Sequence, residues 1–256
     1  MLKKTLEQTP PLLLVGCGLF FVSAYFAARF PDVPGASVGS FIANGVIFAP
    51  AAISLFLWLG PRRASISLIA LAAFAYAIET TGLVTGLPYG EFIYGEALGP
   101  KAFGLVPYLL PVSYLPLVLG AVGAGWGSGT ASRVIKTALI LAAIDLVLDP
   151  GAVRLGFWEY ASGGIYYGVP ISNYLGWMIS GALAAVVFLL AARPTTPPPR
   201  GLLDSAILAV AFWVGIAVFT TLVLPALVGV LVLMFLLIRR TSLSVRKPRV
   251  ATCKAV

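Results

Sequence analysis

Long apolar runs separated by short basic segments are the feature that most limits what this chain can fold into. Hydrophobic residues make up 60% of the 256 residues and only 10% are charged, whereas a soluble domain carries about 25% charged residues. The mean hydropathy is +1.00, and a single core of this length cannot hide so much apolar surface from water. We therefore expect an all-α integral membrane protein, a polytopic helical bundle in a lipid bilayer.

The apolar runs have the length that a membrane requires, since a helical span needs about 20 apolar residues to cross roughly 30 Å of hydrocarbon. The sequence predicts about eight transmembrane helices, at residues 12–29, 38–59, 64–85, 102–124, 131–149, 171–192, 203–219 and 222–238. The last two belong to one uninterrupted apolar run, which we expect to turn near Thr220 and Thr221, ahead of Pro225. One strongly tilted helix, giving seven spans, is the alternative.

The basic residues favour eight spans. With eight, both termini and the alternate loops share one side, which collects 14 of the 17 Lys and Arg residues and leaves Arg29, Lys101 and Arg154 on the other. The positive-inside rule makes the first side cytoplasmic. We expect a multi-pass protein of the cell membrane, with one membrane domain over residues 1–238 and a basic cytoplasmic tail over 239–256. Basic clusters placed between spans do not indicate nucleic-acid binding.

The carboxylates follow the opposite pattern. Only Glu7 and Asp204 fall on the cytoplasmic side. Acidic residues contribute little to orientation, so the accumulation of acids on the other side predicts a functional site toward the outer leaflet. The seven acids on that side are Asp32, Glu79, Glu91, Glu96, Asp145, Asp149 and Glu159.

The absence of histidine excludes several classes of site. His-ligated zinc, haem and non-haem iron centres, and Ser-His-Asp or Cys-His nucleophiles, all need this residue. Cys17 and Cys253 are too few for a thiolate metal cluster and lie at opposite ends of the chain. We therefore expect no histidine- or thiolate-ligated metal centre, and acid–base chemistry from carboxylates.

Three acids are the candidate catalytic residues because a charged side chain in a bilayer is costly and needs a reason. Glu79 lies about four turns into the third predicted span, and Asp145 and Asp149 lie at the outer end of the fifth. Their i, i+4 spacing puts Asp145 and Asp149 on one helix face, where they repel, so one of them is expected to hold its proton at neutral pH. The alternative is that Asp149 only ends the helix before Pro150 while Asp145 pairs with Arg154.

The outer loops are rich in Gly, Pro and aromatic residues. Tight turns at membrane depth are tolerated only around protein or a water-lined cavity, and Pro107, Pro111 and Pro116 of the fourth predicted span leave carbonyl groups free near the same end. We predict an aromatic, acid-containing pocket that opens toward the outer leaflet, with Glu91, Glu96 and Glu159 as solvated loop acids. The candidate substrate-binding residues are Tyr76, Tyr89, Tyr94, Trp158, Tyr166, Tyr167, Asn173 and Trp177.

Such a pocket suits the protonation of an alkene. A protonated carboxyl can donate its proton to an electron-rich double bond, and aromatic faces stabilise the resulting tertiary carbocation. A water molecule activated by a second carboxylate can then capture that cation.

The same segments resemble a known family. Over about residues 40–190, the sequence resembles the integral-membrane carotenoid biosynthesis proteins typified by bisanhydrobacterioruberin hydratase and gamma-carotene hydratase. The resemblance implies cofactor-free addition of water across the terminal C=C of an acyclic carotenoid, of the C50 bisanhydrobacterioruberin type or the C40 lycopene type, giving a tertiary alcohol. The motifs that carry it are Glu79–Gly82, Gly86–Gly90, Asp145–Pro150, Gly156–Trp158, Tyr166–Pro170 and Asn173–Trp177.

Two other functions share these features. A carotenoid end-group cyclase would use the same protonation, but an internal double bond would capture the cation instead of water. A proton-coupled transporter would also need intramembrane acids and Pro-broken helices, but with acids near the midplane. The sequence leaves open the carotenoid chain length, whether one or both ends react, which carboxylate is the acid, and the oligomeric state.

Overall fold

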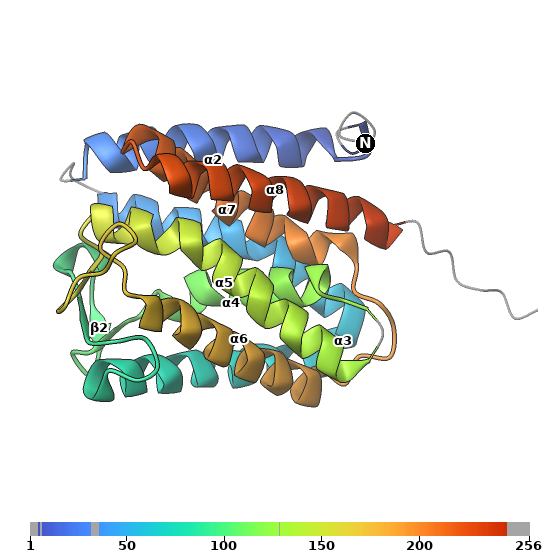
Figure 1. Ribbon diagram of the computed structural model, residues 1–256. Helices are drawn as coiled ribbons and strands as arrows, with labels where there is room; N and C mark the ends of the chain where they lie inside the picture. The colour runs from blue at the N-terminus through green and yellow to red at the C-terminus, as the bar shows by residue number, and fades with distance from the viewer. Residues whose placement is uncertain (1–4, 6, 32–35, 128, 245–256) are drawn as a thin grey trace, which may run out of the picture.

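The computed structural model describes residues 5, 7–31, 36–127 and 129–244, and this part of the chain forms a bundle of helices (Figure 1). Asp32, Cys253 and residues 245–256 of the expected tail lie outside the described residues. The helices are α2 (Pro11–Arg29), α3 (Ala36–Thr85), α4 (Leu110–Ala124), α5 (Thr130–Arg154), α6 (Ile171–Ala192), α7 (Asp204–Phe219) and α8 (Val223–Ser244).

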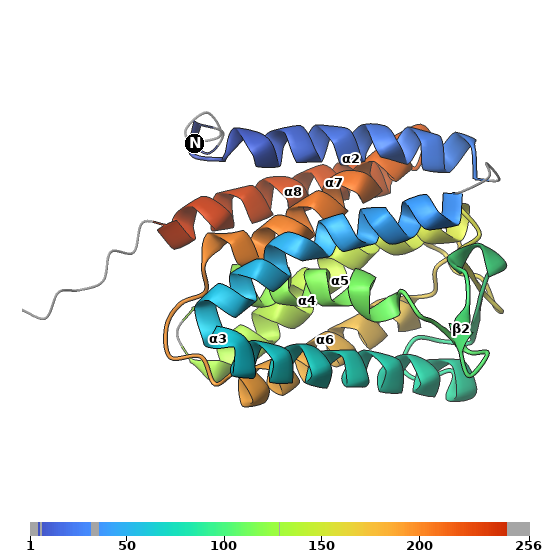
Figure 2. The same cartoon turned by 180° about the vertical axis from the view of Figure 1, so that it is seen from behind.

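Helix α3 turns back on itself at Gly60. This residue has φ 74° and ψ 165° inside an element that is otherwise helical, and Pro61 follows it. A positive φ is readily adopted only by glycine, and proline is well suited to the first turn of a helix. The two halves of α3 run in opposite directions (Figures 1 and 2), as expected from the separate spans predicted at 38–59 and 64–85.

Helix α7 lies at the centre of the bundle, in contact with α2, α3, α4, α5 and α8. Every residue from Ser205 to Ala211 is buried. Small residues allow the neighbouring helices to approach closely. A methyl group at Gly120 of α4 would lie 2.3 Å from the Ala206 side chain, and one at Gly215 would lie 2.6 Å from the Phe21 carbonyl oxygen of α2.

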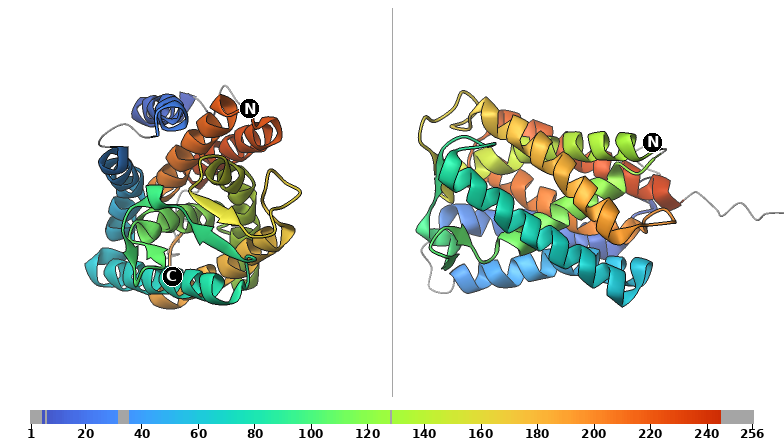
Figure 3. Two further views of the ribbon diagram at one scale, coloured as in Figure 1. Left: turned by 90° about the vertical axis from the view of Figure 1, so that its left-hand side faces the viewer. Right: turned by 90° about the horizontal axis from the view of Figure 1, so that it is seen from below.

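Two very short sheets lie across one end of the bundle. Strand β1 (Phe92–Tyr94) pairs antiparallel with β4 (Trp158–Tyr160), and β2 (Lys101–Ala102) pairs with β3 (Val106–Pro107). The end-on view in Figure 3 shows strands in front of the helices. The β1–β4 pair joins the loop after α3 to the loop after α5, so two segments far apart in sequence meet over this end.

The opposite end carries the N-terminal part of α2, the turn of α3 and the C-terminal end of α8 (Figure 1). Arg240 of α8 donates from Nε and Nη2 to the two carboxylate oxygens of Asp204, at 2.5 and 3.1 Å. Arg239 donates to the carbonyl oxygens of Ala124 and Trp126 at 2.7 and 2.9 Å. These contacts tie α8, which continues to Ser244, to the first turn of α7 and the end of α4.

Three predicted helix boundaries are wrong, one of them the end of the last span, since α8 continues beyond 238 to Ser244. The fourth span does not begin at 102, because Phe103 (φ 52°) and Gly104 (φ 72°) make the β2–β3 turn, and Pro107 lies in β3. Helix α4 therefore has 15 residues. The fifth span does not end at 149, since α5 continues through Pro150 to Arg154, so Asp149 does not serve as a helix terminus.

Within the described residues, five helices are long and apolar enough to cross a membrane: Pro11–Arg29, Val38–Thr85, Ile171–Ala192, Arg200–Phe219 (which includes the 3-10 turn Arg200–Leu203) and Val223–Leu243. The protein is a helical membrane protein.

Candidate active site

Three buried carboxylates meet near the end of the bundle that carries the strands. Glu79 lies six residues before the end of α3, and Asp145 and Asp149 face inward from α5. Their exposed fractions are 8%, 0% and 1%. Glu79 lies close enough to both aspartates to interact with them electrostatically. The structure thus brings together the three acids that the sequence singled out.

Asn173 bridges the two aspartates. Its Nδ2 donates to Asp145 Oδ2 at 2.7 Å and to Asp149 Oδ2 at 2.5 Å. Asn173 is the third residue of α6 and is 1% exposed. Asp145 therefore has an amide as its partner, rather than Arg154, which is exposed. An amide nitrogen holds two acidic side chains close together without neutralising either charge.

The β1–β4 sheet supplies a phenol to two of the carboxylates. Tyr94 donates to Glu79 Oε2 at 2.9 Å, and Tyr160 donates to Asp149 Oδ2 at 2.7 Å. Desolvation is the largest cause that raises the pKa of both phenols well above the ordinary range, so both keep the proton they donate. The sheet therefore supplies an uncharged donor to each of these two acids, Glu79 and Asp149.

The inner face of this sheet is aromatic. Alternate residues of a strand point to one face, and the register sets Phe92 opposite Tyr160 and Tyr94 opposite Trp158. The ring centroids of Phe92 lie 5.4 Å from Tyr94 and 5.8 Å from Tyr160, and Tyr94 lies 6.0 Å from Trp158. Ile93, on the other face, is exposed. Four rings thus form a continuous layer next to the carboxylates.

Tyr89 is inserted between two helices at positions where only glycine fits. A methyl group on Gly176 of α6 would lie 2.6 Å from Tyr89 Cδ1, and one on Gly82 of α3 would lie 2.9 Å from Tyr89 Cδ2. The ring is 3% exposed, and its phenol lies close enough to Glu79 and Asp145 to interact electrostatically with both. The two glycines therefore place a hydroxyl beside the acids.

The remaining candidate aromatic residues do not bind the carboxylates directly and make other contacts. Trp177 packs on Tyr114, with ring centroids 5.8 Å apart. Tyr166 donates to the Leu146 carbonyl oxygen at 3.2 Å. Two others point elsewhere: the Tyr76 phenol donates to the Tyr108 carbonyl oxygen, and the exposed Tyr167 accepts a hydrogen bond from the Leu224 N–H of α8.

The loop acids Glu91, Glu96 and Glu159 are exposed, as predicted. Glu96 pairs with Lys101 at 2.8 Å, and this hydrogen bond and charge lower the pKa of the carboxyl. Glu91 and Glu159 line an open cleft of about 480 Å³ beside the end of α3. Phe92 lines the same cleft and packs on Tyr94 and Tyr160 on its inner side. Phe92, backed by Tyr94 and Tyr160, therefore lies between the cleft and the carboxylates.

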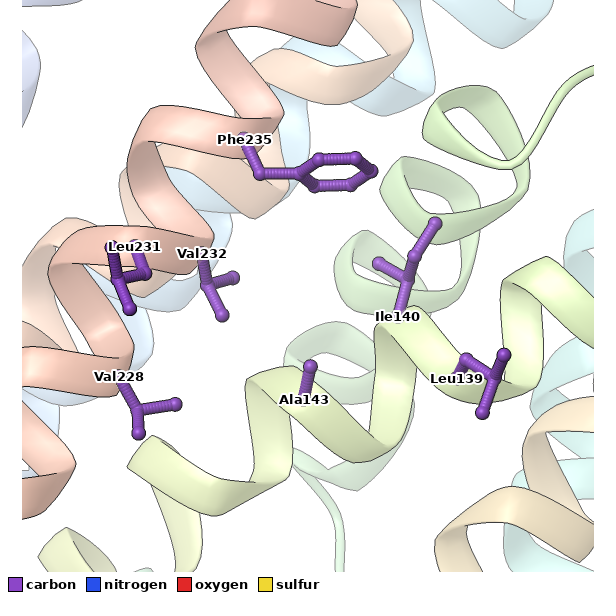
Figure 4. A pocket seen from close by; sticks show the side chains of 7 residues that line it. All are labelled: Leu139, Ile140, Ala143, Val228, Leu231, Val232 and Phe235. Atoms are coloured by element: carbon purple, nitrogen blue, oxygen red, sulfur yellow. The ribbon is translucent and has the colours of Figure 1, made fainter.

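A second groove, of about 270 Å³, is entirely apolar and lies between α5 and α8 (Figure 4). Successive helix residues are about 100° apart, which places the α5 side of this groove roughly opposite Asp145 and Asp149. The groove is therefore not part of the carboxylate site. Its lining residues are Leu139, Ile140, Ala143, Val228, Leu231, Val232 and Phe235.

Comparison with known proteins identifies the family. The sequence profile of the family described as "Carotenoid biosynthesis protein" matches residues 40–236, well over half of the chain. The chain belongs to this family. The resemblance expected from the motifs is therefore confirmed, and the matched range includes all three carboxylates together with Tyr94, Tyr160 and Asn173.

One member of the carotenoid biosynthesis family is similar over much of the chain. The bisanhydrobacterioruberin hydratase of Haloarcula japonica is 41% identical over 171 residues. The match covers 62% of this chain and 58% of the relative, so it spans less than two thirds of the relative's length. No solved structure matches the sequence.

Sequence reasoning missed three polar residues of this family member's site: Tyr160, Tyr114 and Ser180. Tyr160 binds Asp149, Tyr114 (5% exposed) lies within electrostatic range of Glu79, and Ser180 (0% exposed) lies beside Tyr114 and Tyr89. The repeated aromatic spacing of Phe92–Tyr94 and Trp158–Tyr160 was the available signal for Tyr160. A serine or tyrosine within an apolar helix gives no comparable signal, because small residues and interfacial aromatics are common in membrane helices.

Proposed function

We propose that this protein is a cofactor-independent carotenoid hydratase. It adds water across the terminal C=C of an acyclic carotenoid end group and gives a tertiary alcohol. The observation that carries the proposal is a set of three buried carboxylates whose hydrogen-bond donors, among the described residues, are the neutral groups of Asn173, Tyr94 and Tyr160. The Haloarcula japonica relative is named bisanhydrobacterioruberin hydratase, and this name supports the same reaction and a substrate of the bisanhydrobacterioruberin type.

Proton donation is the first step. Two adjacent carboxylates that share one amide nitrogen repel each other when both are charged, which favours one bound proton. Asp149 Oδ2 accepts from both Tyr160 and Asn173 and is stabilised as the anion, whereas Asp145 Oδ1 has no hydrogen-bond partner among the described residues. We assign the acid to Asp145. Its proton forms a C–H bond at the less substituted alkene carbon and leaves a tertiary cation.

Water completes the addition. The water oxygen forms a C–O bond to the cationic carbon, and the proton that it loses passes to Glu79, the base. Faces of aromatic rings stabilise the cation, and the candidates are Tyr94, which binds Glu79, Trp158, which packs on Tyr94, and Trp177, which packs on Tyr114. The balance is one water added per reacted end, with no electron acceptor or donor.

We also propose that the chain crosses the bilayer eight times, with both termini in the cytoplasm and the carboxylates toward the outer leaflet. The fold-back at Gly60 divides the 48-residue span into two crossings. Helix α4 is short, about 22 Å at 1.5 Å per residue, and α5 carries five charged residues. Both helices therefore lack the usual marks of a span, although they lie among the spanning helices (Figures 1 and 3).

An isotope experiment tests the reaction. The full chain is expressed in a host that makes acyclic carotenoids, grown in oxygen-18 water, and the pigments are analysed by mass spectrometry. We expect a tertiary hydroxyl labelled from water. Label only from dioxygen would exclude hydration, and a product with no added mass would indicate the cyclase.

Matched variants then connect the reaction to the site. Glu79→Gln should accumulate unhydrated carotenoid, whereas Glu91→Gln, which changes an exposed loop acid, should hydrate as the wild type does. Equal product from both variants would remove Glu79 from the mechanism.

A further inference from the structure

Tyr89, Tyr114 and Ser180, here called the hydroxyl cluster, are buried beneath the carboxylates. Ser180 lies beside the phenols of both tyrosines. Even so, Tyr114 Oη and Ser180 Oγ have no hydrogen-bond partner of adequate geometry among the described residues. Buried hydroxyls without partners are rare in native proteins, and an ordered water molecule is a common explanation.

The hydroxyl cluster is formed by three separate elements. Tyr89 comes from the loop after α3, Tyr114 from α4 and Ser180 from α6. Ser180 lies two turns after Asn173, about 10 Å deeper along α6. Both phenols lie close enough to Glu79 for electrostatic interaction, and Tyr89 also lies close to Asp145. The Tyr89 phenol of the cluster is therefore within electrostatic range of both the proposed acid and the proposed base, and the Tyr114 phenol is within range of the base.

We propose that the hydroxyl cluster binds the water molecule that captures the carbocation. The proposal rests on the proposed function and adds the residues that hold the nucleophile. A buried water needs two to four polar partners, and the Tyr114 and Ser180 hydroxyls can each donate and accept. The free oxygen of Asp145 completes a set of unpartnered polar atoms in this region.

The geometry gives the water a defined role. A tertiary cation that is not captured loses a proton from a neighbouring carbon and returns to an alkene. A water held beside Glu79 competes with that loss, because its oxygen forms the new C–O bond while Glu79 accepts its proton. The β1–β4 sheet covers the carboxylates, so a water retained inside the bundle is available without opening the site to bulk solvent.

The experiment separates protonation from water capture. Membranes containing the full chain are incubated with bisanhydrobacterioruberin in D₂O, and the carotenoids are analysed by mass spectrometry. Wild type should give mostly hydrated product. Tyr114→Phe and Ser180→Ala should still protonate the alkene but fail to trap the cation, so deuterium appears in unhydrated carotenoid. The ratio of hydrated to deuterated unhydrated carotenoid should fall roughly fivefold, the value of one lost hydrogen bond between neutral groups.

Matched controls remove the same groups elsewhere. Ser67→Ala deletes a buried serine hydroxyl that bonds the Arg63 carbonyl oxygen on α3, and Tyr25→Phe deletes an exposed phenol on α2. Both should keep the wild-type ratio.

Three outcomes would overturn the proposal. An unchanged ratio in Tyr114→Phe, which removes only one oxygen atom, would overturn the water site even if Ser180→Ala fails to accumulate. A lower total turnover at the wild-type ratio would also overturn it, since it would indicate a structural role. Absence of hydration by the wild type would overturn the proposed function together with the water site.

Discussion

Carboxylates at the two ends of the bundle are compensated in different ways. Asp204 accepts hydrogen bonds from Nε and Nη2 of the Arg240 guanidinium. At the other end, Glu79, Asp145 and Asp149 bind only phenols and an amide, and no Lys or Arg in the described chain forms an ion pair with them. A paired carboxylate is fixed as an anion, whereas one held by neutral donors can gain and lose a proton. The first arrangement serves structure, and the second permits proton transfer.

The largest expected effect on the hydration rate comes from replacing a carboxylate that has no cationic partner. Asp145→Asn removes the proposed proton donor and should lower the hydration rate roughly 100-fold or more. The thermal midpoint of the purified protein in detergent should stay the same or rise, because a buried acid without a cationic partner is costly. A drop in midpoint as large as that of an ion-pair variant would contradict the distinction between the two ends.

Removing the cationic partner of Asp204 should have the opposite effect: it should lower stability and leave hydration unchanged. Arg240→Met leaves Asp204 without its partner and should lower the free energy of unfolding by about 3 kcal/mol, as for other partly or fully buried pairs that lose one member. Hydration per folded molecule should not change. Denaturant titration in detergent measures the loss, and adding Asp204→Leu to the same chain should recover most of it.

The smallest effect belongs to the neutral donors. Tyr160→Phe removes one hydrogen bond to the Asp149 carboxylate, worth about 1.5 kcal/mol, and should slow hydration roughly tenfold. Initial rates with saturating carotenoid measure this change, with Tyr25→Phe as the matched control. A loss as large as that of Asp145→Asn would mean that the phenol takes part directly in proton transfer.

Much of the fold followed from the sequence because a bilayer requires helices of a fixed length. The predicted limits of α2 and α6 agree within one residue with the structure. The errors lie where the membrane constraint is absent. At residues 101–107 a tight hairpin replaces the predicted helix start, and at Pro150 the helix continues because proline blocks only one backbone hydrogen bond, which tertiary packing can tolerate.

The three carboxylates of the site, and the neutral residues Tyr94 and Asn173 that bind them, could be predicted from the sequence. Other neutral residues of the site could not. Glu79, Asp145 and Asp149 are conspicuous because acids are expensive in apolar segments. Tyr160 and Ser180 are not, since a hydroxyl in a loop or a membrane helix has many structural uses. The pairing of β1 with β4 also joins segments more than 60 residues apart through strands of three residues, which are too short to leave a periodic signal.

The β1–β4 sheet connects two of the three carboxylates. Tyr94 and Tyr160 lie on its two strands, and each binds a different carboxylate. Glu79 of α3 and Asp149 of α5 are therefore linked through one small structural unit, and a movement of that unit would change the hydrogen bonding of both carboxylates at once.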